Sequence, residues 1–166
     1  VDTPAQRGLI TLLREPEIND LLRMHRLRLV VSGTATRAMQ EALWAARDAK
    51  HVVAVLGGAT ACDALAEVLS AAPVLPADSA LGCIVEDCMD GDGSRSPTSM
   101  CVRATLPTIN ASDVEHLRDS VEQGLRLSRA DETPTVTLAH PSIFRSGSTI
   151  VLRPNRSADE EDSAAR

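Results

Sequence analysis

A strand that ends in two glycines and leads directly into a helix constrains the fold of this chain more than any other feature. Residues 51–69 read HVVAVLGGATACDALAEVL, with an apolar, β-branched run before the glycines and an amphipathic helical pattern after them. In α/β proteins such a junction binds phosphate, because backbone N–H groups at a helix N-terminus point at the ligand. Here the turn continues as Ala-Thr-Ala at 59–61, without an acid, a lysine or a further glycine. The pattern predicts the scaffold of a phosphate site and little of its chemistry.

Expected strands and helices alternate along the chain. Strands are expected over 27–31, 52–56, 81–85 and 100–106, and a closing hairpin is expected from 134–139 and 149–153 with a turn around 145–147. Helices are expected over 8–24, with a break at Pro16, and over 36–48, 61–71 and 112–128, and a polar, glycine-rich loop over 86–99. This alternation is typical of a three-layer, doubly wound, mainly parallel sheet, so the predicted fold class is α/β and Rossmann-like.

The length of the chain predicts one folded unit. A chain of 166 residues can bury a core of its own. Residues 1–24 are expected to form an N-terminal helical segment, residues 25–156 the α/β domain, and residues 157–166 an acidic tail that has nothing to bury. Because the chain starts with valine, we expect it to be processed or only partly represented.

Three local patterns predict which side chains are buried and where a helix starts. Met39, Leu43 and Trp44 are spaced for one buried face of the helix expected over 36–48. The strand at 52–56 is almost entirely apolar, which is expected when both faces of a sheet are covered. Residues 112–115 read Ser-Asp-Val-Glu and predict a capping box, in which the serine and the glutamate bond each other's backbone N–H groups.

Charge and aromatic content exclude several classes of partner. The net charge of −6 gives no basic patch for RNA or for an anionic membrane, so any RNA contact is expected to use other groups. Trp44 and Phe144 are the only aromatic residues, which argues against recognition of single-stranded nucleic acid by stacking. Lys50 is the only lysine, and no stretch of about 20 apolar residues predicts a membrane span.

The cysteines and acidic residues predict neither a disulfide framework nor a metal site. In a chain of this length, Cys62, Cys83, Cys88 and Cys101 are expected to be free thiols in a reducing intracellular compartment, either the mitochondrion or the cytoplasm. Three of these cysteines and the histidines lack the spacing of a zinc site. The acidic residues at 86–92 do not fit a calcium-binding loop, so no metal and no other cofactor is expected.

The stretch from 27 to 69 resembles the nucleotide-binding lobe shared by diacylglycerol kinases, sphingosine kinases and NAD kinases. Those families show a strand, a threonine-containing turn, an alanine-rich helix, a second strand and then Gly-Gly-Asp-Gly-Thr at the start of a helix. The matching elements here read VVSGTATRAMQEALWAARDAKHVVAVLGGATACDALAEVL over 30–69, and the strand at 81–85 is similar to a later family strand. The resemblance covers residues 25–90 and implies a vestigial phosphate site at Gly57, Gly58, Thr60 and Thr34.

The departures from the kinase pattern imply that the reaction has been lost. Only Gly57 and Gly58 remain of the glycine motif, because Ala59 replaces the acid and Ala61 replaces the threonine. A second family motif after the third strand is absent, and the chain ends before the β-rich lobe of such kinases. A rival resemblance to methylglyoxal synthase, carried by residues 25–34 and 56–58, requires an acid at position 59 and fails at the same alanine.

These observations predict a function and leave two alternatives open. The expected function is a non-catalytic α/β subunit or accessory protein of a larger assembly, for which a mitochondrial ribonucleoprotein such as the mitochondrial ribosome would be a natural host. The first alternative is a nucleotide-dependent lipid or small-molecule kinase whose missing lobe comes from another chain. The second is a regulatory domain that binds phosphate or a sugar phosphate at the two turns around Thr34 and Gly57.

Overall fold

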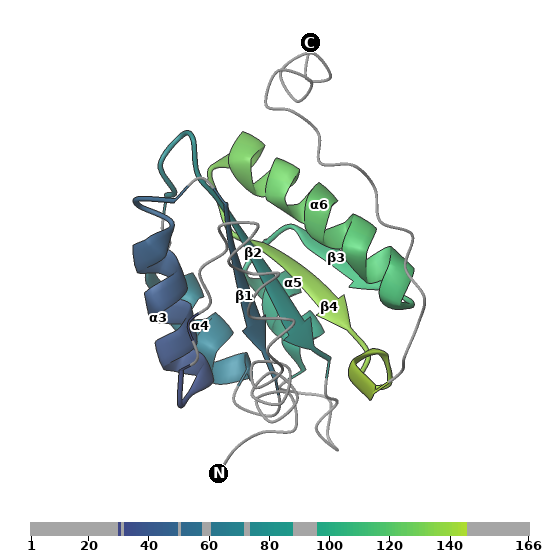
Figure 1. Ribbon diagram of the computed structural model, residues 1–166. Helices are drawn as coiled ribbons and strands as arrows, with labels where there is room; N and C mark the ends of the chain where they lie inside the picture. The colour runs from purple at the N-terminus through teal and green to yellow at the C-terminus, as the bar shows by residue number, and fades with distance from the viewer. Residues whose placement is uncertain are drawn as a thin grey trace, which may run out of the picture.

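The computed structural model in Figure 1 describes residue 30 and residues 32–49, 51–57, 61–71, 74–87 and 96–145. In these residues four parallel strands form one sheet in the order β1-β2-β4-β3, with β1 at His51–Leu56, β2 at Ala80–Glu86, β3 at Thr108–Ala111 and β4 at Thr135–Ala139. The helices are α3 at Ala35–Ala45, α4 at Ala61–Ala71, α5 at Pro97–Arg103 and α6 at Val114–Asp131, with a 3-10 helix η1 at Ile143–Arg145.

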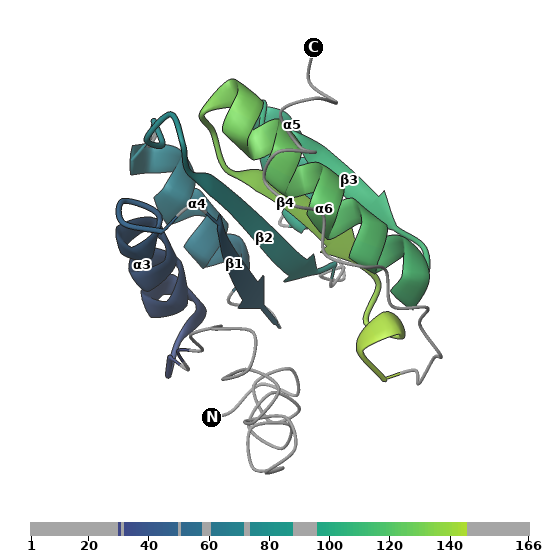
Figure 2. The same ribbon diagram turned by 45° about the horizontal axis from the view of Figure 1, so that its top comes forward.

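The helices cover both faces of the sheet (Figures 1 and 2). Helices α3, α4 and α5 share one face, and α6 packs on the other face against β2, β3 and β4. The three-layer, doubly wound α/β fold predicted from the sequence is therefore confirmed. The expected helix at 8–24, the strands at 27–31 and 149–153 and the tail at 157–166 lie outside the described residues, apart from Val30, which is in no strand.

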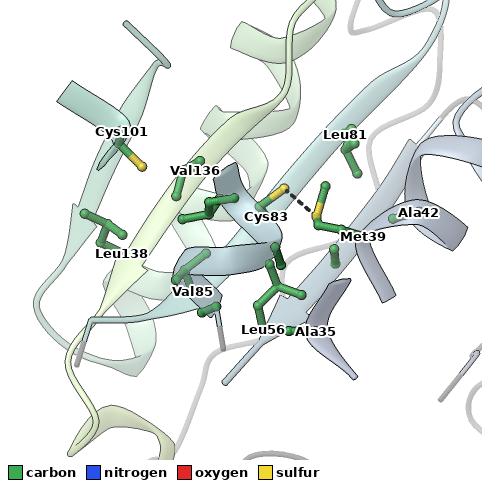
Figure 3. Close-up of a cluster of buried hydrophobic side chains, with 14 of the residues drawn as sticks. Ala35, Met39, Ala42, Leu56, Leu81, Cys83, Val85, Cys101, Val136 and Leu138 are labelled. Atoms are coloured by element: carbon green, nitrogen blue, oxygen red, sulfur yellow. Dashed lines mark hydrogen bonds between the residues drawn. The ribbon is translucent and has the colours of Figure 1, made fainter. Parts of the chain in front are cut away.

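The main core lies between the sheet and the α3–α4–α5 layer and is built from aliphatic and sulfur-containing side chains (Figure 3). Met39 of α3 is only 1% exposed, and its Sδ lies 3.6 Å from Sγ of Cys83 on β2. Leu56, Leu81 and Val85 project from the neighbouring strands into the same cluster. Met39 is thus buried as its spacing predicted, and Leu65 of α4 is fully buried as well.

Trp44 does not belong to the buried face that the sequence spacing predicted for α3. The buried side of this helix consists of Ala35, Met39 and Ala42, with Leu43 partly buried beside it, whereas Trp44 is 74% exposed. Five residues along an α-helix correspond to a rotation of about 140°, so position 44 lies on the opposite side from position 39. The prediction for Trp44 was wrong, and the bulkiest side chain of the chain points outward.

The expectation that β1 is covered on both faces was also wrong. Ala54 and Leu56 are buried against the α3–α4–α5 layer, but Val53 and Val55 on the opposite face are 43% and 41% exposed. Successive side chains of a strand point to opposite faces, so the two valines lie on the α6 side of the sheet. Helix α6 covers β2, β4 and β3, and the described residues leave β1 open on this side.

Residues around 100 form a helix rather than the expected strand at 100–106. Ser96 caps α5, since its Oγ accepts the backbone N–H of Ser99 at 3.1 Å, and Pro97 occupies the first helical turn, where proline is favoured. Among the described residues the next strand after β2 is β3, which begins only at Thr108. The expected hairpin of 134–139 with 149–153 was wrong as well, because β4 pairs with β2 on one side and β3 on the other.

Helix α6 starts one residue later than the predicted capping box. Asp113 is the N-cap, and its Oδ1 accepts the backbone N–H of His116 at 2.7 Å. Its other carboxylate oxygen accepts the hydroxyl of Ser112 at 2.9 Å. These hydrogen bonds hold the pKa of Asp113 below its ordinary value. The bond from the His116 backbone has the larger effect and the bond from Ser112 the smaller one. Ser112 is thus the residue before the cap, and Glu115 has no role in a capping box.

Small residues form the buried side of α6 against the sheet. Ser120, Gly124 and Ser128 are buried, while the larger apolar side chains of the helix are only half-buried, namely Val114, Leu117, Val121 and Leu125. A Cβ atom at Gly124 would lie 3.4 Å from Cγ2 of Thr135, and one at Gly82 would lie 3.4 Å from Cδ2 of Leu125. The helix therefore lies close to the strands, at a distance that larger side chains would not allow.

Two buried serines of α6 provide a matched test of this packing. Oγ of Ser128 accepts the backbone N–H of Leu81 at 2.9 Å, whereas Oγ of Ser120 is buried without a hydrogen-bond partner among the described residues. We expect Ser128→Ala to lower the free energy of unfolding by about 2 kcal/mol, since it leaves a buried N–H unpaired. Ser120→Ala is expected to change it by less than about 0.5 kcal/mol or to stabilise the fold. Urea unfolding followed by far-UV circular dichroism measures both, and equal losses would contradict the Ser128–Leu81 bond.

Candidate functional site

At the carboxyl ends of the neighbouring strands β2 and β4, the connections that follow the two strands run to opposite faces of the sheet. After β2 the chain leads to α5, which shares the α3–α4 face, whereas after β4 it leads to η1. Ile143 and Phe144 of η1 pack with Val114 and Leu117 of α6, so this connection runs on the opposite face. In open α/β sheets ligands bind in the crevice outside such a point, and the candidate site is therefore the edge between β2 and β4.

Asp87 and His140 follow the two strands at this edge. Glu86 is in register with Ala139, and the backbone N–H of Asp87 donates to the carbonyl oxygen of Ala139 at 2.9 Å. Asp87 and His140 are the next residues on adjacent strands. The Asp87 carboxylate accepts the hydroxyl of Thr98 from α5, at 3.2 and 3.3 Å to its two oxygens. The sheet thus places the backbones of Asp87 and His140 about one strand spacing, roughly 4.8 Å, apart.

The imidazole of His140 is held by the turn that follows it. Its Nδ1 lies 2.8 Å from Oγ of Ser142 and accepts the Ser142 backbone N–H at 3.2 Å. A neutral ring with Nδ1 as acceptor carries its proton on Nε2. A nucleophile–base pair needs a third group that orients the base, but among the described residues the Asp87 carboxylate bonds to Thr98 and not to this ring. The geometry is that of a local turn.

Glu86 is the second carboxylate at this edge and is buried on the α6 side of the sheet. It shares that face with Gly82, which contacts Leu125 of α6, because the two residues are four apart on one strand. Together, Glu86 and Asp87 place two acidic side chains on opposite faces of β2 at the switch point. Two carboxylates repel a phosphate, so this edge is better suited to a cationic or hydroxyl-bearing group than to an anion.

The phosphate site predicted at Gly57, Gly58, Thr60 and Thr34 is only partly within the described residues. Gly57 is buried at the carboxyl end of β1, which is two strand spacings, or roughly 10 Å, from β4. Thr34 caps α3 at the same edge of the sheet, and its Oγ1 accepts the backbone N–H of Arg37 at 3.2 Å. Gly58 and Thr60 lie outside the described residues, so the site of all four residues stays a prediction.

The other hydroxyl of this turn is also bonded within the chain. Ser32 donates its hydroxyl to Oε2 of Glu41, and Nε of Arg37 donates to Oε1 of the same carboxylate at 3.0 Å. These two hydrogen bonds hold the pKa of Glu41 below its ordinary value. The bond from Ser32 has the larger effect and the bond from Arg37 the smaller one. The N-terminal turn of α3 thus uses Ser32 and Thr34 to hold the helix end, which is the default role of hydroxyls there.

The described thiols are buried and are not available as nucleophiles. Cys62, Cys83 and Cys101 are free and buried. Burial, with a smaller contribution from Cys101, raises the pKa of Cys83 to about 12, and burial raises the pKa of Cys101 as well. Because the thiolate is the reactive form, neither group can serve as a nucleophile at neutral pH.

The raised pKa of Cys83 predicts a loss of stability in alkaline solution. An unfolded chain ionises this thiol near its ordinary pKa of 9.0, while the folded chain keeps it neutral up to about 12. Keeping the Cys83 thiol neutral therefore stabilises the fold fully below pH 9.0. This stabilisation is lost progressively as the pH rises from 9.0 to about 12. Unfolding free energies measured at a series of pH values should fall more steeply there than those of Cys83→Ala. Equal slopes would show that the thiol is not buried as described.

Comparison of the chain with protein-family models, with curated proteins and with solved structures finds no match. Among the described residues, no group of three or more histidine, cysteine and acidic side chains is arranged to hold a metal ion. None of the described helices is long and apolar enough to cross a membrane.

Sequence reasoning did not single out the β2–β4 edge. The sequence predicts a polar loop over 86–99, which includes Asp87 and Thr98, and it predicts no site at His140. The available signal was an acidic residue directly after a buried strand, at Glu86 and Asp87. The sequence does not predict that β4, which follows β3 along the chain, inserts between β2 and β3.

Proposed function

We propose that this chain is a non-catalytic α/β subunit of a larger assembly and that it binds a protein partner through the outer face of α3. The observation that carries the proposal is Trp44, which is 74% exposed although it is the only tryptophan of the chain. Tryptophan is among the residues most enriched at the energetic centres of protein interfaces. An exposed indole that takes no part in the described core has no role in stabilising the fold.

The side chains around Trp44 fit the rim of such an interface. Arg37 and Gln40 lie seven and four positions before Trp44, so they share its side of α3. Arg47 lies in the turn just after this helix, and all three side chains are exposed. Gln40 donates to a carboxylate oxygen of Glu67 on α4, and Arg37 pairs with Glu41. A central aromatic side chain between two arginines resembles the composition of an interface core with its polar rim. A partner surface with an apolar pocket flanked by carboxylates would complement it.

The polar groups at the carboxyl edge support the absence of catalysis. Ser32, Thr34, Asp87, Asp113 and His140 each form a hydrogen bond with a neighbour in the chain that accounts for their position. Burial raises the pKa of the Cys83 and Cys101 thiols, so these two stay neutral at physiological pH. In addition, Ala59 and Ala61 stand where the kinase-like pattern has an acid and a hydroxyl. The kinase-like ancestry and a mitochondrial ribonucleoprotein as host are parts of the hypothesis.

A thermal-shift titration of the purified chain tests the non-catalytic part of the proposal. Neither ATP with Mg²⁺ nor inorganic phosphate should raise the melting temperature, because a ligand stabilises a fold in proportion to its binding to the folded state. Stabilisation by several degrees with ATP and Mg²⁺ would favour the kinase alternative. The same shift with phosphate alone, abolished by Gly57→Asp in a variant that still folds, would favour the phosphate-binding alternative.

A further inference from the structure

Helix α5 ends on a strained residue. Thr105 has a φ of 56°, in the left-handed region that a residue branched at Cβ rarely adopts. The backbone N–H of Thr105 donates to the carbonyl oxygen of Val102 at 3.2 Å, and that of Leu106 donates to Cys101 at 3.1 Å. These two bonds form a Schellman motif, in which glycine usually takes the position of Thr105. Closing α5 in this way therefore strains the backbone, and a glycine would avoid that strain.

The remainder of α5 does little to offset this strain. With seven residues it is the shortest α-helix in the described part of the chain, and its only buried residues are Pro97 and Cys101. Val102, in the last turn of the helix, is 71% exposed. Elements with few buried apolar side chains open locally at a lower free energy than the fold as a whole.

Helix α5 covers an apolar part of β4 and also contacts the candidate site. Cys101 belongs to the same core cluster as Val136 and Leu138 of β4 (Figure 3), which are 0% and 2% exposed. The second residue of the helix, Thr98, donates its hydroxyl to the Asp87 carboxylate. Lifting the helix would therefore expose the apolar surface of β4 and release this carboxylate in one event.

We propose that α5 is a lid that opens as a local unit while the sheet and the other described helices stay folded, and that the strain at Thr105 sets how often it opens. In the open form, the carboxyl edge between β2 and β4 is joined to an apolar surface. A ligand or partner that binds this surface would hold the lid open, because binding shifts an equilibrium towards the form that the ligand prefers. The lid is independent of the proposed interface at Trp44.

Hydrogen–deuterium exchange of the full chain tests the lid. Amides at 100–106 should exchange about tenfold or more faster than those at 136–138 in β4, after correction for intrinsic rates, because exchange follows the population of the open form. Thr105→Gly should slow the exchange at 100–106 about fivefold, since glycine adopts the left-handed conformation without strain. Thr105→Val keeps the branched side chain and should not slow the exchange.

Glu132→Gly provides the matched control, because Glu132 has a φ of 52° at the end of α6. This variant should slow exchange at the end of α6 and leave the rates at 100–106 unchanged. Thr98→Val removes the bond to Asp87 and should speed exchange at 100–106 about threefold; an unchanged rate would overturn the link between the lid and the candidate site. Exchange at 100–106 that is as slow as in β4, or that Thr105→Gly leaves unaltered, would overturn the lid itself.

Discussion

Replacing Gly124 with leucine is expected to lower the free energy of unfolding by about 3 kcal/mol, at the upper end of the usual cost of overpacking a core. Gly124 lies on the buried side of α6, and a Cβ there would already be 3.4 Å from Cγ2 of Thr135 and 3.7 Å from Oγ1 of Thr137. The further carbons of leucine have no space between helix and sheet. The helix would have to move away from β4 and lose its contact with Gly82.

Two matched variants separate this steric effect from helix propensity. Gly124→Ala adds only the Cβ, at an ordinary contact distance, and gains up to about 1 kcal/mol of helix propensity. Gln123→Leu makes the larger change at an exposed neighbour of the same helix and should alter stability by less than about 0.5 kcal/mol. Urea unfolding followed by circular dichroism at the helix band measures all three. A Gly124→Leu protein as stable as the unmodified one would contradict the close packing of α6.

The second large effect is expected on association rather than on stability. Trp44→Ala should weaken binding of the partner by at least 2 kcal/mol, or about 30-fold in the dissociation constant, if the indole lies at the centre of the interface. The melting temperature should stay unchanged, since the side chain is 74% exposed and contributes nothing to the core cluster. Titration of the purified partner into each variant by calorimetry gives the affinity.

Other exposed side chains provide the controls for Trp44. Val102→Ala removes an apolar side chain that is equally exposed but lies on α5, and it should leave the affinity unchanged. Arg47→Ala removes an exposed cation from the turn just after α3 and should weaken binding by less than the tryptophan variant, with an effect that shrinks as salt is added. If Val102→Ala and Trp44→Ala weakened binding equally, the interface would not be centred on α3.

The sequence was most informative where a local pattern decides the structure. The helix at 61–71 has the bounds of α4, and the apolar runs at 52–56 and 81–85 are β1 and β2, because alternation and helical periodicity are local properties. The fold class followed from their order. In contrast, Trp44 was assigned to a buried face because its apolar character was given more weight than its angle around the helix.

The rest of the fold and the candidate site depend on pairing between strands that are far apart in the sequence, and local patterns do not predict such pairing. β3 has only four residues, and no sequence pattern distinguishes it from a loop, while Ser96 and Pro97 give the start of α5 that was overlooked. The position of β4 between β2 and β3 depends on long-range contacts. For this reason the sequence does not predict that Asp87 and His140 follow neighbouring strands.

The sedimentation of the tagged chain in an extract of its own source cells tests the proposed function most directly. The account predicts that the chain sediments with a particle much larger than its own 17.6 kDa, and that Trp44→Ala, at the same expression level, is found in the slow fraction. Treatment with ribonuclease would release the chain if the particle is a ribonucleoprotein. Sedimentation of the unmodified chain as a free monomer, indistinguishable from Trp44→Ala, would contradict the account.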